Sequence, residues 1–90
     1  MQADYKRVTK LLKTARGQLG GILRMVEEDK YCVDISHQIL ACDAVLRRAN
    51  REILQAHLES CVQGAFHSGS KEETDAKIQE LVELIGKLSK

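Results

Sequence analysis

A chain of 90 residues makes one domain and buries only a limited core by itself, so association with further copies is an expected source of stability. It has no proline, 30% charged residues, two tyrosines and one phenylalanine, which favours an all-helical protein and argues against a surface that stacks single-stranded bases. The net charge is +1, yet residues 1–24 hold six basic residues against the single acid Asp4, a local charge of +5. A basic helix favours an anionic partner, although a charge run by itself is more often a solvated helix face.

The first predicted element is an amphipathic helix from about residue 4 to residue 28. Its apolar residues recur at intervals of three and four positions, which is the period of one helix face. They are Val8, Leu11, Leu12, Ala15, Leu19, Ile22, Leu23 and Val26. The acidic and polar residues 27–31 then predict a turn.

The second predicted element is a long helix, because residues 32–61 contain neither glycine nor proline. A heptad-like apolar stripe runs along it, which favours packing against another long helix, including a second copy of itself. The stripe consists of Ile35, Ile39, Cys42, Leu46, Ala49, Ile53 and Ala56. Residues 64–69, between two glycines, are predicted to end this helix.

The third predicted element is a helix that starts after Ser70 and runs to the C-terminus. Ser70 and Glu73 have the spacing of a capping box, in which each side chain bonds the other residue's amide. The expected fold is therefore all-α: a three-helix protomer with a long central helix, forming a single domain over residues 1–90.

Cys32, His57 and Cys61 form the most informative constellation of the chain. On one helix Cys32 would lie roughly 38 Å from His57 and roughly 44 Å from Cys61, so the three cannot meet within a protomer. His57 and Cys61 are four positions apart and share a helix face. An antiparallel second copy would bring its Cys32 beside them, which predicts two identical intersubunit sites per dimer.

Two thiolates and one imidazole are a soft ligand set that suits Cu(I), whereas structural zinc usually takes a fourth protein ligand. Cys42 lies on the apolar stripe and is predicted to be a buried hydrophobe. His37 and His67 are interpreted as surface and loop residues. No nucleophile–base arrangement, phosphate loop or close carboxylate pair occurs, so we expect no enzyme activity.

Three groups of residues resemble the copper-sensitive operon repressor family: Arg16-Gly17-Gln18, Cys32, and the segment from His57 to Cys61. The resemblance covers nearly the whole chain. It implies an antiparallel helical dimer that assembles into a dimer of dimers. It also implies a repressor that binds operator DNA when metal-free and dissociates when Cu(I) occupies the Cys32/His57/Cys61 site, which derepresses copper-resistance genes.

The resemblance assigns residues to a DNA-binding surface, namely Arg16, Gln18 and Arg48. Charge alone adds their basic neighbours Lys10, Lys13, Arg47 and Arg51. Such phosphate contacts should make the affinity fall steeply with salt.

Two residues are predicted to orient the bound imidazole from outside the ligand set. Tyr31 precedes Cys32 and offers a hydroxyl. The copper-responsive members of the family have a glutamate on the third helix. Simple counting places Lys77 near that position, with Glu73 and Glu80 flanking it, and Glu80 is the predicted carboxylate.

Other members of the family differ at positions that this chain allows us to compare. Nickel and cobalt members use an additional N-terminal histidine, and residues 1–30 contain none. Formaldehyde-responsive members lack the second cysteine, which is present here as Cys61. Persulfide-sensing members lack the histidine, which is present here as His57.

Two alternative functions stay open on the sequence. The first is a reactive-sulfur sensor in which Cys32 and Cys61 react across a dimer interface. The second is a metal-buffering helical protein that never binds DNA. Because no N-terminal segment resembles a signal peptide and the three cysteines show no disulfide framework, we expect a cytoplasmic protein with reduced thiols.

Overall fold

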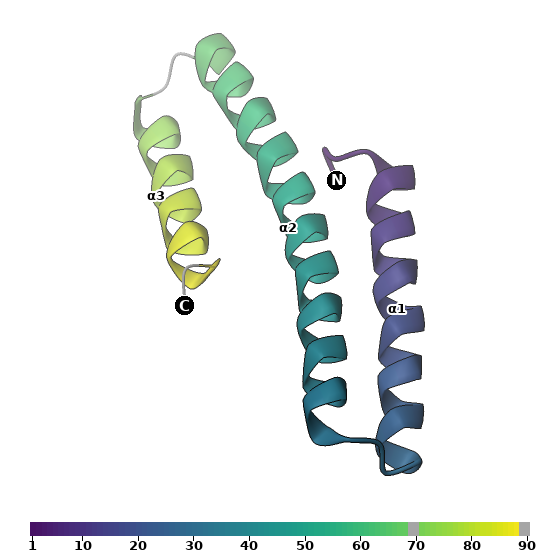
Figure 1. Cartoon of the computed structure of the whole chain (residues 1–90). Coiled ribbons are helices and arrows are strands. Elements are labelled where there is room, and N and C mark those ends of the chain that lie inside the picture. Colours follow the sequence, from purple (N-terminus) through teal and green to yellow (C-terminus); the bar gives the residue numbers. More distant parts are fainter. Residues whose placement is uncertain (69–70, 89–90) are drawn as a thin grey trace.

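The computed structural model describes the backbone of residues 1–68 and 71–88, with the side chains of these ranges except 61, 62, 65–68 and 88. Within these ranges the chain forms three helices and no strand: α1 (Tyr5–Glu27), α2 (Cys32–Ser68) and α3 (Lys71–Leu88). Figure 1 shows α1 running antiparallel beside the first part of α2, and α3 beside the last part. The helices form a flat, elongated layer whose extents along its three principal axes are 58, 28 and 13 Å. This confirms the all-α protomer with a long central helix.

The limits of α1 follow from its two caps. Asp4 accepts hydrogen bonds from the backbone amides of Lys6 (2.9 Å) and Arg7 (3.3 Å), which satisfies two otherwise unpaired donors of the first turn. At the other end, the amide of Lys30 donates to the carbonyl of Met25 and that of Asp29 to Val26, the bonds of a Schellman motif. Asp29 has a φ of 55°, a left-handed conformation more common for glycine.

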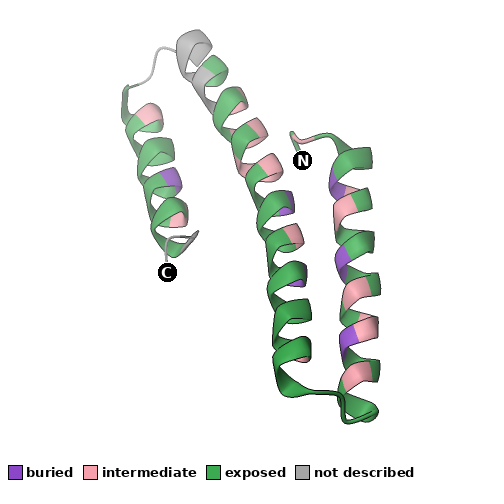
Figure 2. Ribbon diagram, viewed as in Figure 1, coloured by how far each residue is buried: buried purple, intermediate pink, exposed green. Residues whose placement is uncertain are grey.

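The core between α1 and α2 is built on residues seven positions apart. In α1 the buried residues are Val8, Ala15 and Ile22, and in α2 they are Cys42 and Ala49. Figure 2 shows the buried parts of the two helices facing each other. Ala15, Ile22 and Cys42 form one cluster, with Ile35 and Val45 packed against it. The contact between α1 and α2 is therefore the apolar core of the protomer.

Two predictions concern the region between the second and third helices. The stretch from Gly64 to Gly69 was predicted to end the second helix, and α2 ends within it, at Ser68. One glycine in a helix interior costs only about 1 kcal/mol, so α2 continues past Gly64. The predicted capping serine, Ser70, lies outside the described residues.

The apolar stripe of α2 is buried on only one side. Ile39 and Leu46 were predicted to belong to it, yet they are 51% and 46% exposed. Exposed apolar residues also line α1, including Leu19 and Leu23, so the chain alone leaves much of its helix surface uncovered. None of the described helices has the length and hydropathy needed to cross a membrane.

Candidate metal centre and DNA-binding surface

The proposed metal ligands stand near opposite ends of α2. Cys32 is the first residue of the helix, and its thiol is free and exposed. His57 is half-buried and comes 25 positions later, roughly 38 Å along the helix axis. Cys61 belongs to α2 four positions beyond His57, but its side chain lies outside the described part. Among the described residues of one chain, no three His, Cys, Asp or Glu side chains are close enough to hold a metal ion.

His57 lines a surface pocket of about 410 Å³ that joins three parts of the chain. Besides His57, α2 contributes Ile53 and Leu54; α3 contributes Glu80 and Leu84, and the N-terminal segment contributes Met1 and Gln2. The pocket therefore brings a carboxylate from α3 to the candidate imidazole ligand. Lys77, which counting along the chain had suggested, does not line it.

Tyr31 lies at the Cys32 end of α2, far from this pocket. Its backbone carbonyl accepts the amide of Ile35 (3.1 Å), and its ring is 66% exposed. Tyr31 and Glu80 therefore cannot act on the same metal site within one chain. They could share a site only if two copies contribute to it.

Cys42 is buried against α1, where its Sγ donates a weak hydrogen bond to the carbonyl of Ala15 at 3.6 Å. This confirms its predicted role as a core residue. His37 is exposed, as predicted. His67 was interpreted as a loop residue, but its backbone belongs to α2, and its side chain lies outside the described residues.

The basic residues of α1 that were predicted to bind DNA are free to do so. Lys10, Lys13 and Arg16 are exposed, and none of them forms an ion pair in the described part of the chain. Lys13 and Arg16 line a shallow depression of about 290 Å³ together with Thr9 and Leu12. The side of α1 that carries them is therefore electropositive.

The other residues that were predicted to bind DNA differ in their exposure and in whether they already have a partner within the chain. Arg47 is exposed but donates to Asp43, one turn earlier, at 2.8 Å. Arg48 and Arg51 are exposed and have no ion-pair partner among the described residues. Gln18 is half-buried, and its Oε1 is buried without a hydrogen-bond partner in the chain. Its carbonyl oxygen therefore faces the protein interior rather than solvent.

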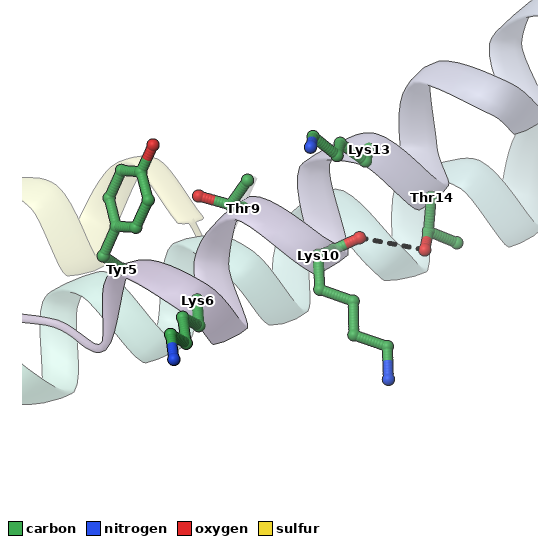
Figure 3. Close-up of a pocket in the computed structure, with 6 residues that line it drawn as sticks. All are labelled: Tyr5, Lys6, Thr9, Lys10, Lys13 and Thr14. Carbon is green, nitrogen blue, oxygen red and sulfur yellow. Dashed lines mark hydrogen bonds between the residues drawn. The ribbon is translucent and has the colours of Figure 1, made fainter.

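Sequence reasoning missed several residues at these sites. Arg7 counted towards the basic charge, yet it pairs with Glu52 of α2 at 2.6 Å, which occupies its guanidinium. Tyr5, Lys6 and Thr9 line a second depression of α1, shown in Figure 3. Thr9 comes four positions after Tyr5 and three after Lys6, and this spacing of one helix face was the signal that could have found them.

Comparison with known proteins decides the family. The family model described as "Metal-sensitive transcriptional repressor" matches residues 4–87. The chain belongs to this family. The copper-sensing transcriptional repressor CsoR of Mycobacterium ulcerans (strain Agy99) is 47% identical over 83 residues, which cover 91% of this chain and 68% of that protein.

Solved structures of the metal-sensitive repressors have the same fold. The copper-sensing repressor CsoR with Cu(I) from Geobacillus thermodenitrificans NG80-2 superposes with a TM-score of 0.82 and 34% identity, covering 94% of this chain and 85% of that one. The nickel-responsive transcriptional regulator InrS also gives a TM-score of 0.82, with 26% identity and coverage of 92% and 93%. The relatives are repressors and not enzymes. This chain is accordingly a metal-sensing repressor, and the identity of its metal is a separate question.

Proposed function

We propose that this protein is a Cu(I)-responsive repressor that binds operator DNA when metal-free and dissociates when Cu(I) binds between two subunits. The ligands would be Cys32 of one copy with His57 and Cys61 of another. The observation that carries this proposal is the position of Cys32 and His57 near opposite ends of one continuous helix. A second copy running antiparallel would bring such residues together.

The uncovered apolar surface supports the assembly that this site requires. Ile39, Leu40 and Leu46 are exposed on the part of α2 that lies between Cys32 and His57. A second α2 packed antiparallel along this stretch would bury these side chains and place each Cys32 near the opposite His57. Exposed Ile78, Val82 and Ile85 of α3 offer a further apolar face for the dimer of dimers.

The donors fit a soft monovalent ion. Cys32 presents a free, exposed thiol, and two thiolates with one imidazole favour Cu(I). Glu80 lies in the pocket of His57, where its carboxylate can accept a hydrogen bond from the ring nitrogen that does not bind metal. Tyr31 of the copy that supplies Cys32 would flank the same site.

The relatives support copper but leave nickel as an alternative, since one structural neighbour is nickel-responsive. Nickel prefers nitrogen and oxygen donors in square-planar or octahedral arrangements more than a three-donor thiolate site. Residues 1–30 contain no histidine that could supply such donors. The donor set of this chain therefore favours Cu(I).

The proposed response requires thermodynamic coupling between metal and DNA. If Cu(I) weakens DNA binding by a given factor, DNA must weaken Cu(I) binding by the same factor, and typical couplings of about 1–3 kcal/mol correspond to about 5- to 150-fold. The metal ligands come from α2, against which α1 with its unpaired cations is packed. A change in how two copies of α2 pack would therefore alter the spacing of the basic surfaces.

An anaerobic Cu(I) titration followed by X-ray absorption, with and without operator DNA, tests this proposal. We expect one Cu(I) per protomer, two sulfur donors and one nitrogen donor, and weaker Cu(I) binding in the presence of DNA. Ni(II) in a parallel titration should leave DNA binding unchanged. Metal binding by isolated monomers, or DNA release by Ni(II) alone, would contradict the proposal.

The exposed thiol of Cys32 favours one alternative, a sensor of reactive sulfur. In that reaction Cys32 and Cys61 of two copies lose two protons and two electrons to a polysulfide, which is reduced while one or more sulfur atoms bridge the cysteines. Mass spectrometry after anaerobic polysulfide treatment distinguishes the two functions. An interprotomer crosslink that releases DNA, with Cu(I) having no effect, supports the sulfur sensor.

A further inference from the structure

The first turns of α1 carry a groove that the predicted DNA-binding residues do not account for. It has a volume of about 480 Å³ and is formed by α1 alone (Figure 3). Its lining consists of three lysines and three hydroxyl-bearing residues: Tyr5, Lys6, Thr9, Lys10, Lys13 and Thr14. Lys10 and Lys13 were predicted to bind DNA and Thr9 also lines the depression beside Arg16, whereas Tyr5 and Lys6 belong to neither set.

The groove is electropositive because nothing in it neutralises the lysines. Residues 5–26 contain no Asp or Glu, and Lys6, Lys10 and Lys13 form no ion pair in the described part of the chain. The nearest acid in sequence, Asp4, uses its carboxylate to cap the amides of the first turn. Arg7 differs from these lysines, because its guanidinium group forms an ion pair with Glu52.

Of the three hydroxyl groups that line the groove, one already donates a hydrogen bond within α1 and two do not. Thr14 donates its hydroxyl to the carbonyl of Lys10 at 2.9 Å, drawn as the dashed line in Figure 3. The hydroxyls of Tyr5 and Thr9 make no hydrogen bond within the described residues, so both can donate to a ligand. In Figure 3, Tyr5, Thr9 and Lys13 lie along one edge of the groove, while Lys6 and Lys10 lie along the other.

We propose that this groove binds phosphate groups of the operator backbone, with the three lysines supplying charge and Tyr5 and Thr9 donating hydrogen bonds. Phosphate oxygens accept from this mixture of lysines and hydroxyls in protein–DNA complexes. The groove lacks the Arg, Asn and Gln side chains that read bases by paired hydrogen bonds. It therefore fixes the register of α1 on the duplex and carries no sequence preference. This inference rests on the proposed repressor function and extends its contact surface to the first turn of α1.

Two pairs of variants test the groove against controls that change the same chemistry elsewhere. Lys6→Gln is compared with Lys30→Gln, which also removes one exposed ammonium group but at the α1–α2 turn, where it pairs with Glu28. Thr9→Val is compared with Thr14→Val, because the Thr14 hydroxyl is already donated within the helix. Tyr5→Phe removes the remaining hydroxyl. Circular dichroism confirms that each variant folds.

The measurement is the DNA affinity as a function of salt, for the promoter upstream of the protein's own gene and for an unrelated duplex. Lys6→Gln should lower the slope of log K against log salt by about 1, because one phosphate contact is lost. Thr9→Val and Tyr5→Phe should each weaken binding about 10-fold and leave the slope unchanged, since they remove neutral donors to a charged group. Lys30→Gln and Thr14→Val should match the wild type. The losses should be equal on both duplexes.

Three outcomes separate the possible failures. If the wild type binds neither duplex in a salt-dependent manner, the repressor function itself is wrong. If the wild type binds but Lys6→Gln and Lys30→Gln have equal slopes, or Thr9→Val matches Thr14→Val, only the groove inference is overturned. Titration with inorganic pyrophosphate in the absence of DNA covers the other source of phosphate. Pyrophosphate binding that depends on Lys6 and Thr9, while Lys6→Gln and Thr9→Val bind DNA as their controls do, would assign the groove to a free anion and overturn the DNA contact.

Discussion

His57 of α2 and Glu80 of α3 line the same pocket, although no hydrogen bond joins the two side chains. A carboxylate in this position can orient an imidazole through the ring nitrogen that does not hold the metal. Because Glu80 belongs to α3, it can also transmit a change at His57 to a helix that carries none of the ligands. We therefore propose Glu80 as a positioning residue in this response.

Glu80→Gln should reduce the factor by which Cu(I) weakens DNA binding by about 10-fold, because the amide orients the imidazole less strongly. The DNA affinity of the metal-free protein should be unchanged. Fluorescence anisotropy with labelled operator, with and without Cu(I), measures both quantities. Glu83→Gln, an exposed position of the same helix, is the control and should behave as wild type. Equal coupling in the two variants would remove Glu80 from the mechanism.

His57→Ala should retain much of the Cu(I) affinity, since two thiolates are left, but should lose most of the coupling to DNA. The expected result is a protein that binds Cu(I) and stays on the operator. Competition with a chromophoric Cu(I) chelator gives the affinity, and anisotropy gives the coupling. Normal release of DNA by Cu(I) in this variant would show that His57 does not trigger the response.

Cys42→Ala should lower the free energy of unfolding by about 1–2 kcal/mol, because it leaves a small cavity between α1 and α2 and removes the bond to the Ala15 carbonyl. Its Cu(I) stoichiometry should be unchanged. Urea unfolding at a fixed protomer concentration measures the first effect. Cys32→Ala is the opposite case: the residue is exposed, so stability should hardly change while Cu(I) binding is lost. Loss of Cu(I) binding in Cys42→Ala would contradict the assignment of ligands.

Asp29→Gly should stabilise the protein by about 0.5 kcal/mol, raising Tm by a few degrees. Glycine adopts the left-handed φ of 55° without strain, although its greater freedom in the unfolded chain offsets part of the gain. Thermal unfolding followed by circular dichroism measures the shift. Asp29→Ala should change Tm in the opposite direction, because alanine tolerates this conformation less well than aspartate. A fall in Tm for both variants would mean that the Asp29 side chain stabilises the turn.

The helices were predictable because each is encoded locally. The periodic apolar residues and the Asp4 cap define α1, and the absence of glycine and proline between Cys32 and Cys61 defines the centre of α2. The end of α2 was also predictable, since the helix ends at Ser68, within the stretch from Gly64 to Gly69. Exposure of Ile39 and Leu46 was not predictable, since helical periodicity gives one apolar face but not which neighbour covers it.

The ligands of the candidate site stay a prediction from sequence, whereas its surroundings needed the structure. Spacing along the chain separates Cys32 from His57, and the structure confirms that both belong to the single helix α2. The choice of Glu80 over Lys77 beside His57 depends on how α3 folds back onto α2, which no local pattern encodes. The same is true of Arg7, whose pairing with Glu52 joins residues 45 positions apart.

The length of α2 also bears on how the protein would sense its ion inside a cell. Because Cys32 and His57 are far apart along one helix, a single protomer holds only part of the proposed metal site. The complete site would form only when two copies pair. By mass action, the apparent affinity for Cu(I) would then rise with the concentration of the repressor. The Cu(I) concentration that triggers the response would depend on the metal ligands and also on how much repressor the cell contains.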